Sequence, residues 1–198
     1  IHDFYGFPQE LFEVEYPAKG NPELAKETAE LLAPTSVIET DSWGLDHGAW
    51  SVIKHLYPAA NIPVIQMSID YTQPAQYHFD LAKKLQKLRE KGILIIGSGN
   101  IVHNLRMIDW KNINTVGAGW DWAIEARAKT NEWILDGNFQ NLIHFEKQGT
   151  ALQNAIPTPD HYLPLIYTLG LKEKSDNISL FNDELIGGSL SMTSVLIN

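Results

Sequence analysis

The apolar positions along this chain form short unbroken runs that alternate with segments of helical spacing. Residues 35–39 (Thr-Ser-Val-Ile-Glu), 63–69 (Pro-Val-Ile-Gln-Met-Ser-Ile) and 93–96 (Ile-Leu-Ile-Ile) contain the β-branched residues that favour strands. The run at 93–96 is apolar at every position and leads directly into Gly-Ser-Gly. That pattern predicts a parallel strand that is buried on both faces and ends in a tight turn. Residues 189–197 alternate well enough to predict a final strand.

The segments between these runs carry helix signals. Asn21 and Pro22 predict a helix that continues to about Leu32, because asparagine caps helix N-termini and proline is accepted in the first turn. Leucines at helical spacing predict one amphipathic helix over residues 74–90. Further helices are predicted over residues 47–56 and 120–135 and from near Thr158. Because strands and helices alternate, we expect one α/β domain with a central, mostly parallel sheet flanked by helices.

Charge and cysteine content narrow the possible functions. The chain has 24 acidic residues against 15 lysines and arginines, a net charge of −9, which argues against binding to nucleic acid or to an anionic membrane. It has no cysteine, so disulfides, thiolate metal sites and thiol nucleophiles are excluded. No apolar stretch approaches the ~18 residues of a membrane span, and no signal-peptide pattern is visible. We therefore expect a cytoplasmic protein without nucleic-acid or membrane partners.

The first candidate for chemistry is His103, which follows the apolar run at 93–96. In open α/β sheets, ligands bind beyond the carboxyl ends of strands, and a titratable imidazole in that position is well placed for catalysis or metal binding. Asn100 and Asn104 flank it. An imidazole that only forms hydrogen bonds within its loop remains an alternative interpretation.

Two other histidines lie next to residues that favour turns and helix starts. His47 follows Asp46 at a predicted helix N-terminus, where bound anionic oxygen is stabilised. His161 follows Asp160, which we interpret as a helix cap. No His-x-x-x-His spacing is present, so a metal site would need ligands from separate elements. Structural or surface roles are expected for His55, His78 and His144.

Six segments, standing in order along the chain, closely resemble the class III (LigB-type) extradiol ring-cleavage dioxygenases, in particular the 4,5-DOPA extradiol dioxygenase branch. The similarity covers essentially the whole chain, and six ordered motifs are far more specific than one. The segments are Ile1-His-Asp-Phe-Tyr-Gly-Phe-Pro8, Trp43-Gly-Leu-Asp-His-Gly-Ala-Trp50, Pro63-Val-Ile-Gln-Met-Ser-Ile-Asp70, Gly99-Asn-Ile-Val-His-Asn-Leu-Arg106, Pro157-Thr-Pro-Asp-His-Tyr-Leu-Pro-Leu165 and Gly188-Ser-Leu-Ser-Met192.

The resemblance implies an enzyme that opens the ring of a catechol such as L-DOPA with O₂ at a non-haem metal. It implies Fe(II) for activity, with Zn(II) possible in purified protein. His103 and His161 match motifs of the family's metal site, and His103 and His47 are the expected catalytic residues. The residues expected to bind substrate or to orient these rings are His2, Asp46, Asn100 and Asn104.

Two further metal-site histidines of the family lie in Gly-His-Gly-Ser-Pro and Ser-Ala-His-Trp motifs, which this sequence lacks. Residues 1–198 are therefore expected to be the C-terminal portion of the catalytic domain, without roughly 60 to 70 residues that include at least one core strand of the parallel sheet. Two alternatives stay open: a non-catalytic binding protein of the same fold, and a zinc-dependent hydrolase. The sequence leaves the oligomeric state open.

Overall fold

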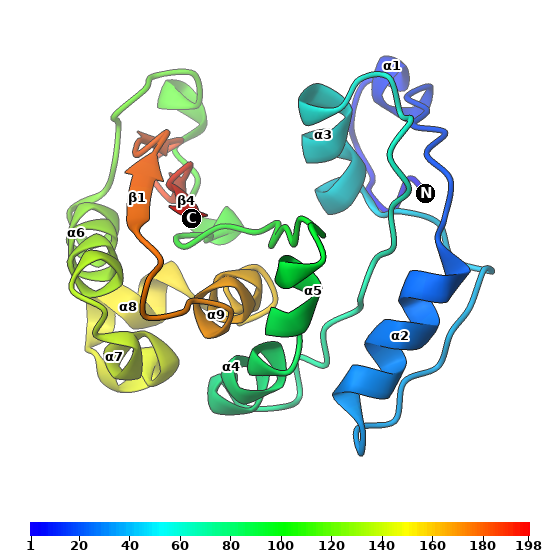
Figure 1. The fold of residues 1–198 in the computed structure, drawn as a ribbon. Helices are drawn as coiled ribbons and strands as arrows, with labels where there is room; N and C mark the ends of the chain where they lie inside the picture. The colour runs from blue at the N-terminus through cyan, green and yellow to red at the C-terminus, as the bar shows by residue number, and fades with distance from the viewer. The chain divides into compact units, whose positions relative to one another are not determined.

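The computed structural model describes residues 1–198, which divide into two compact units, residues 1–68 and 69–198. The first unit is helical and has long extended connections (Figure 1). Its helices are α1 (Gln9–Phe12), α2 (Pro22–Leu32) and α3 (His47–Leu56). No helix in either unit combines the length and the apolar character that a bilayer crossing demands.

Two helices of the first unit begin where the sequence predicts. The side chain of Asn21 accepts a hydrogen bond from the backbone N–H of Leu24, and proline occupies the first turn of α2. The side chain of Asp46 accepts a hydrogen bond from the backbone N–H of Ala49 at the start of α3. Both predicted helices are therefore confirmed, and their start sites are fixed by local capping.

The second unit contains the remaining helices and all the strands. Its helices are α4 (Ala75–Lys83), α5 (Gln86–Glu90), α6 (Asp121–Leu135), α7 (Phe139–Ile143), α8 (Thr150–Ala155) and α9 (Leu163–Gly170), with 3₁₀ turns η1 (Leu105–Met107), η2 (Trp110–Asn112) and η3 (Phe145–Lys147). Its strands are β1 (Ile178–Phe181), β2 (Leu185–Ile186), β3 (Leu190–Ser191) and β4 (Ser194–Ile197). The predicted helix over residues 120–135 is confirmed by α6.

The helix predicted over residues 74–90 is divided into α4 and α5. Between them the N–H groups of Lys84 and Leu85 bond to carbonyls three residues earlier, which tightens the main chain into a 3₁₀-like turn. This tightening keeps Leu81, Leu85 and Leu88 all buried on one side.

The helix predicted from near Thr158 begins later, and the prediction that Asp160 caps it is wrong. The carbonyl of Pro159 accepts hydrogen bonds from the N–H groups of Tyr162 and Leu163, which closes a turn ahead of the helix. Helix α9 then starts at Leu163, with Tyr162 in the capping position and no side-chain cap.

The strands form two small antiparallel pairs. β1 pairs with β4, with Ile178 opposite Ile197, and β2 pairs with β3. The final strand predicted over residues 189–197 is thus present as β3 and β4. Residues 35–39, 63–69 and 93–96 lie outside the strands of either sheet, so the predicted central parallel sheet is not confirmed. A strand forms a sheet only when a partner strand lies beside it. The prediction rested on the apolar runs alone, which do not specify a partner strand.

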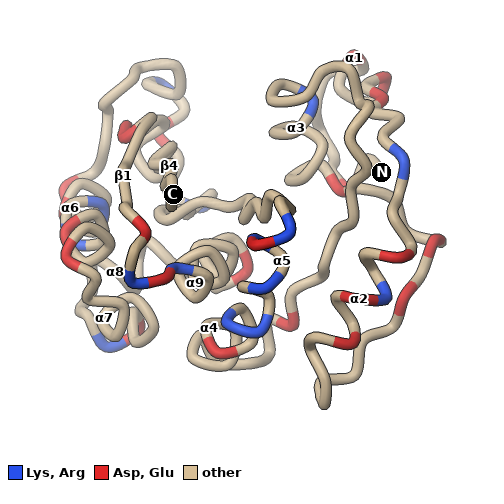
Figure 2. The backbone as a smooth tube through the Cα atoms, in the orientation of Figure 1, with Lys and Arg blue, Asp and Glu red and all other residues tan.

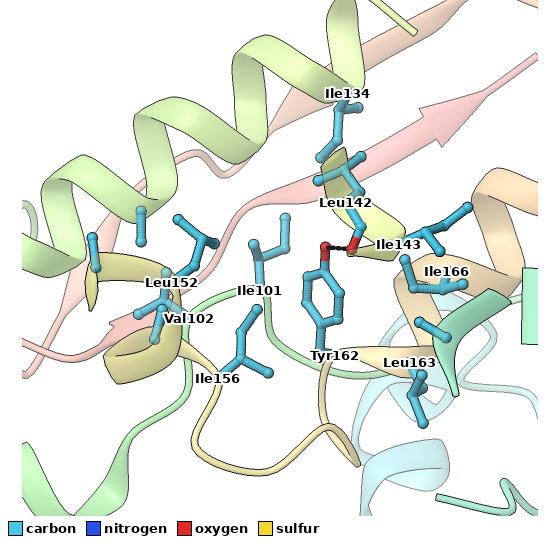
Figure 3. Packing of buried hydrophobic residues seen from close by; sticks show 14 of the residues in the cluster. Ile101, Val102, Ile134, Leu142, Ile143, Leu152, Ile156, Tyr162, Leu163 and Ile166 are labelled. Atoms are coloured by element: carbon cyan, nitrogen blue, oxygen red, sulfur yellow. Dashed lines mark hydrogen bonds between the residues drawn. The ribbon is translucent and has the colours of Figure 1, made fainter. Parts of the chain in front are cut away.

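The core of the second unit lies among α6, α7, α8 and α9 (Figure 3). Tyr162 is its largest fully buried side chain, and its hydroxyl donates to the carbonyl of Leu142 at 2.9 Å. A buried hydroxyl with a partner avoids the cost of an unpaired polar group. The residue after His161 is therefore anchored in the core.

Charged residues are spread along the helices and loops rather than gathered into one basic stretch of the chain (Figure 2). Lysines and arginines recur around α4 and α5, where Arg89 pairs with Asp176 at 2.7 Å. Acidic residues recur along α2 and α6.

Candidate active site

The second unit brings His103 and His161 into direct contact. Their rings stack face to face, with centroids 3.7 Å apart and planes inclined by 11°. His103 lies in the loop that follows residues 93–96, and His161 lies in the turn before α9. Two histidines that are distant in sequence therefore form one imidazole pair.

Main-chain hydrogen bonds hold the two loops together. The N–H of Asn100 donates to the carbonyl of His161 at 2.8 Å, and the N–H of His103 donates to the carbonyl of Ala155 at 2.9 Å. His103 also forms an isolated antiparallel bridge with Leu190 of β3. The position of each ring is therefore set by the backbone on both sides of the pair.

Asn100 and Asn104 support this loop rather than the rings. The amide of Asn100 donates to the carbonyl of Ser191 at 2.8 Å. The amide of Asn104 donates to the carbonyl of Asn154 at 2.8 Å, and its oxygen accepts from the N–H of Arg106. Both side chains thus fix the main chain around His103.

The glycines before His103 permit the close approach of the two loops. A Cβ built at Gly99 would collide with the carbonyl oxygen of His161, and one at Gly97 would lie 2.5 Å from the carbonyl oxygen of Pro164. Neither neighbour is the end of a flexible side chain. The Gly-Ser-Gly sequence is therefore required by packing against the turn that carries His161.

Asp160 orients His161. One oxygen of its carboxylate lies 2.7 Å from Nδ1 of His161. Burial alone would raise the pKa of Asp160, but hydrogen bonding to Thr158 and attraction to His161 outweigh it and hold the pKa below the ordinary value. The carboxylate is ionised at neutral pH and can only accept, so Nδ1 of His161 is the donor.

The environment of His103 disfavours its charged form. Burial, joined by repulsion from the neighbouring His161 ring, lowers the pKa of His103 to about 4. The ring is therefore neutral at pH 7, with one nitrogen able to accept a proton. A neutral imidazole next to a carboxylate-bound imidazole is an arrangement suited to proton transfer.

In the first unit, the other predicted catalytic histidine, His47, also has an aspartate partner. Oδ1 of Asp3 lies 2.9 Å from Nδ1 of His47 and accepts the backbone N–H of the same residue at 3.0 Å. Asp46 caps the helix and accepts from the amide of Gln66 at 2.7 Å. Asp46 therefore supports the start of α3 and does not touch the His47 ring through these bonds.

His2 lies in an aromatic cluster of the same unit. Its Nε2 is 2.9 Å from the carbonyl of Val14. Its ring contacts Phe4, Phe12 and Trp50, and Phe4 also contacts the ring of His47 edge-on at 5.6 Å between centroids. The three site residues predicted in the first unit, His2, Asp46 and His47, thus gather around the N-terminus of α3.

The described side chains do not by themselves fit a metal ion. No group of three or more His, Asp or Glu side chains is arranged to hold one. An imidazole binds a metal in its own ring plane at about 2.0–2.1 Å, so two nearly parallel rings stacked face to face cannot both ligate one ion. The stacked pair therefore does not complete a metal site by itself, and the metal role expected for His103 and His161 stays a prediction.

Two aspartates that contact predicted site histidines, Asp160 and Asp3, are absent from the predicted site residues. Asp160 was predicted to cap a helix instead. For Asp160 the available signal was adjacency, because this aspartate directly precedes His161 in the sequence. For Asp3 no local signal exists, because its partner His47 lies 44 residues away.

Known proteins are similar to this chain over nearly its whole length. Residues 1–190 match the family model described as the catalytic LigB subunit of aromatic ring-opening dioxygenase. A protein from Escherichia coli (strain K12) named 4,5-DOPA dioxygenase extradiol is 42% identical over 200 residues, covering 100% of this chain and 73% of that protein. A protein of the same name from Beta vulgaris is 32% identical over 197 residues, covering 98% of this chain and 72% of its own length.

A solved structure is similar as well. The crystal structure of the uncharacterized protein JW3007 from Escherichia coli K12 has a TM-score of 0.81 and 38% sequence identity. The likeness covers 93% of this chain and 76% of that chain. The mixed helix and strand architecture described above is therefore shared with an experimentally determined fold.

Proposed function

Because the chain belongs to the LigB family of aromatic ring-opening dioxygenases, we propose that it opens the ring of a catechol such as L-DOPA with O₂. Membership makes it an oxidoreductase of the extradiol type. The observation that carries the proposal is the match of residues 1–190 to the family model. Relatives named 4,5-DOPA dioxygenase extradiol favour ring opening over hydrolysis.

The stacked histidines suit the proton transfers that ring opening needs. A catechol must lose a hydroxyl proton before its ring is electron-rich enough to react with O₂, and a proton must later be returned as the O–O bond breaks. His103 is neutral at pH 7, so one ring nitrogen can accept a hydrogen bond from a catechol hydroxyl. His161 carries a proton on Nδ1 toward Asp160 and keeps Nε2 for the site. Both oxygen atoms of O₂ end in the product.

His47 stays our predicted catalytic residue in the first unit, and His2 and Asp46 stay predicted to bind substrate or to orient the histidine rings. Asp3 holds the ring of His47, and the rings of His2, Phe4 and Trp50 pack against one another beside it. Edge-to-face contacts between such rings contribute about 0.5–1.5 kcal/mol each, so they stabilise the surroundings of His47.

The family depends on a metal, and Fe(II) is the ion we propose for activity. Zn(II) is a second ion that purified protein can carry, because it accepts the same nitrogen and oxygen ligands. The donors that hold the metal must include groups beyond the stacked pair. A cytoplasmic location also remains our prediction.

The test is ring opening by the protein loaded with Fe(II) without oxygen and then given L-DOPA and O₂. Replacing His103 with alanine is expected to lower kcat by about 10²–10⁴-fold, the usual cost of losing a general acid or base. The matched control is His55→Ala, which removes an exposed imidazole from α3. Near-normal turnover by His103→Ala, or an equal loss in His55→Ala, would contradict the proposal.

A further inference from the structure

We infer that Ser189 and Ser191 are positioning residues for the reaction, because their buried hydroxyl groups fix the main chain on both sides of His103. The inference deepens the proposed function and rests on it for the reaction that His103 serves. The hydrogen bonds and the placement of the ring do not depend on that function. The two parts can therefore be tested separately.

The two serines bind the residues that flank His103. The hydroxyl of Ser191 accepts a hydrogen bond from the backbone N–H of Val102 at 3.0 Å. The hydroxyl of Ser189 donates to the backbone carbonyl of Asn104 at 2.8 Å. Ser189 is 0% exposed and Ser191 is 1% exposed, so water does not compete for either hydroxyl.

The hydroxyls complete a hydrogen-bond ladder that the main chain leaves incomplete. The antiparallel bridge at His103 is flanked by two residue pairs, Val102 with Ser191 and Asn104 with Ser189. In a regular antiparallel ladder each of these pairs would exchange two main-chain bonds. Here the N–H of Ser191 donates to the carbonyl of Val102 at 3.0 Å, and the N–H of Asn104 donates to the carbonyl of Ser189 at 3.1 Å. The second bond of each pair is made by the serine hydroxyl.

This exchange of partners also serves the rest of the loop. Because the hydroxyl of Ser191 is the acceptor in its pair, its main-chain carbonyl is left to accept the side-chain amide of Asn100 at 2.8 Å. The N–H of His103 itself donates to the carbonyl of Ala155 at 2.9 Å. His103 is therefore held through its own main chain and through both neighbours, and its ring has a fixed place in the stacked pair.

The two hydroxyls are expected to differ in importance. Val102 is 0% exposed and lies in the hydrophobic core (Figure 3), so loss of the Ser191 hydroxyl leaves its N–H buried without a partner. Without the hydroxyl of Ser189, the carbonyl of Asn104 still accepts the N–H of Met107 at 3.1 Å. A buried polar group without a partner is costly, so Ser191→Ala should disturb the loop more than Ser189→Ala.

NMR of the protein tests the hydrogen bonds and the ring directly. The amide hydrogen of Val102 should exchange with solvent about 10-fold faster or more in Ser191→Ala, which lacks its acceptor. At one fixed pH, the ring protons of His103 and His161 should move from the upfield positions of stacked rings toward those of unstacked imidazoles. These ring signals are assigned as those missing from His103→Gln and His161→Gln.

The matched control is Ser194→Ala. The Ser194 hydroxyl also donates to a main-chain carbonyl, that of Met192 at 3.2 Å, but this bond is exposed and lies outside the bridge. Its loss should leave the Val102 exchange and the ring signals unchanged. Unchanged exchange and ring signals in Ser191→Ala, or equal changes in the control, would overturn the inference. If Ser191→Ala does not fold, Ser189→Ala decides: a shift of the ring signals supports the inference, and no shift overturns it.

A kinetic arm connects the placement of the ring to the reaction. In the Fe(II)-loaded protein, Ser191→Ala should lower kcat by about 10–100-fold with a smaller change in KM, because a misplacement of about 1 Å can cost about 10²-fold. Ser191→Thr keeps a hydroxyl and should retain more of kcat than Ser191→Ala, and the reverse order would count against the inference. Displaced ring signals with unchanged kcat would show that the serine does not position His103 for the reaction. If the unmodified protein opens no catechol at all, the proposed function fails, while the NMR results still decide whether the serines place the ring.

Discussion

Each unit of the protein contains an aspartate–histidine pair, and the two pairs are built differently. In the second unit, Asp160 and His161 are neighbours in sequence, and the imidazole is stacked on a second histidine and anchored beside a buried tyrosine. In the first unit, Asp3 reaches a histidine 44 residues away. There the carboxylate also binds the backbone N–H at the first position of α3.

The two aspartates are expected to contribute differently to the stability of the fold. Asp3 satisfies a helix N-terminal N–H as well as a ring, so its loss should weaken the fold around α3. Asp160 caps no helix, and its carboxylate contacts Thr158 and His161 within one turn, so its loss should leave α9 in place. The sequence-adjacent pair is therefore a local contact, whereas Asp3 joins two distant segments of the first unit.

The largest expected contrast is in the response to acid. Because the pKa of His103 is lowered to about 4, the folded state binds fewer protons than the unfolded state between pH 6.5 and 4, and the free energy of unfolding falls as the pH drops through that window. At about 1.4 kcal/mol per pKa unit the whole shift corresponds to about 3.5 kcal/mol, and solvent screening of the partly exposed ring reduces the contribution below that value. The pKa of Asp3 is lowered, because hydrogen bonds from His47 outweigh its burial, so its contribution is lost only below about pH 4.

Urea unfolding at pH 7 and pH 5 measures this contrast. His103→Gln should lose less stability than the unmodified chain over that interval. An identical loss in both proteins would show that His103 does not carry the acid response.

The next contrast concerns glycine. Gly99→Ala should cost about 1–3 kcal/mol of unfolding free energy and reduce ring opening, because the new methyl group meets the carbonyl oxygen of His161. In the first unit, Gly44→Ala brings its methyl group only to ordinary contact, 3.4 Å from the side chain of Ile1. It should be tolerated. Thermal melts of the two variants measure this difference in stability. Equal melting temperatures would show that the close approach of the two loops does not restrict residue 99 to glycine.

The smallest contrast compares the two aspartates directly. Asp3→Ala should lower the free energy of unfolding by about 0.5–2 kcal/mol, the usual cost of losing a helix-capping group. Asp160→Ala should change it by less than about 0.5 kcal/mol, as is common for exposed positions. Chemical denaturation at pH 7 gives both numbers. A larger loss in Asp160→Ala than in Asp3→Ala would reverse the assignment of roles.

Features fixed by neighbouring residues could be predicted from the sequence. Asn21 and Asp46 place the starts of α2 and α3, because a cap acts within three residues. The run at residues 93–96 was predicted to be a strand from its apolar character, yet it pairs with no strand of the two sheets. Pairing depends on distant partners, which local composition does not specify.

In the site, as in the fold, single residues could be predicted from the sequence but their arrangement in space could not. His103 and His161 were identified individually from loop position and from resemblance, but their face-to-face stacking depends on glycine packing and backbone bonds between distant loops. Asp160 was assigned to a cap because threonine, proline and aspartate before an apolar run commonly start helices. The turn closed on Pro159 delays α9 and frees the carboxylate for His161.

The most direct measurement is O₂ uptake compared with catechol loss in the Fe(II)-loaded protein. Extradiol ring opening with the stacked histidines predicts equimolar consumption, a ring-opened product that carries both oxygen atoms, and loss of both signals in His103→Ala. An intact ring, or unchanged uptake in His103→Ala, would contradict the assignment of the stacked pair to this chemistry.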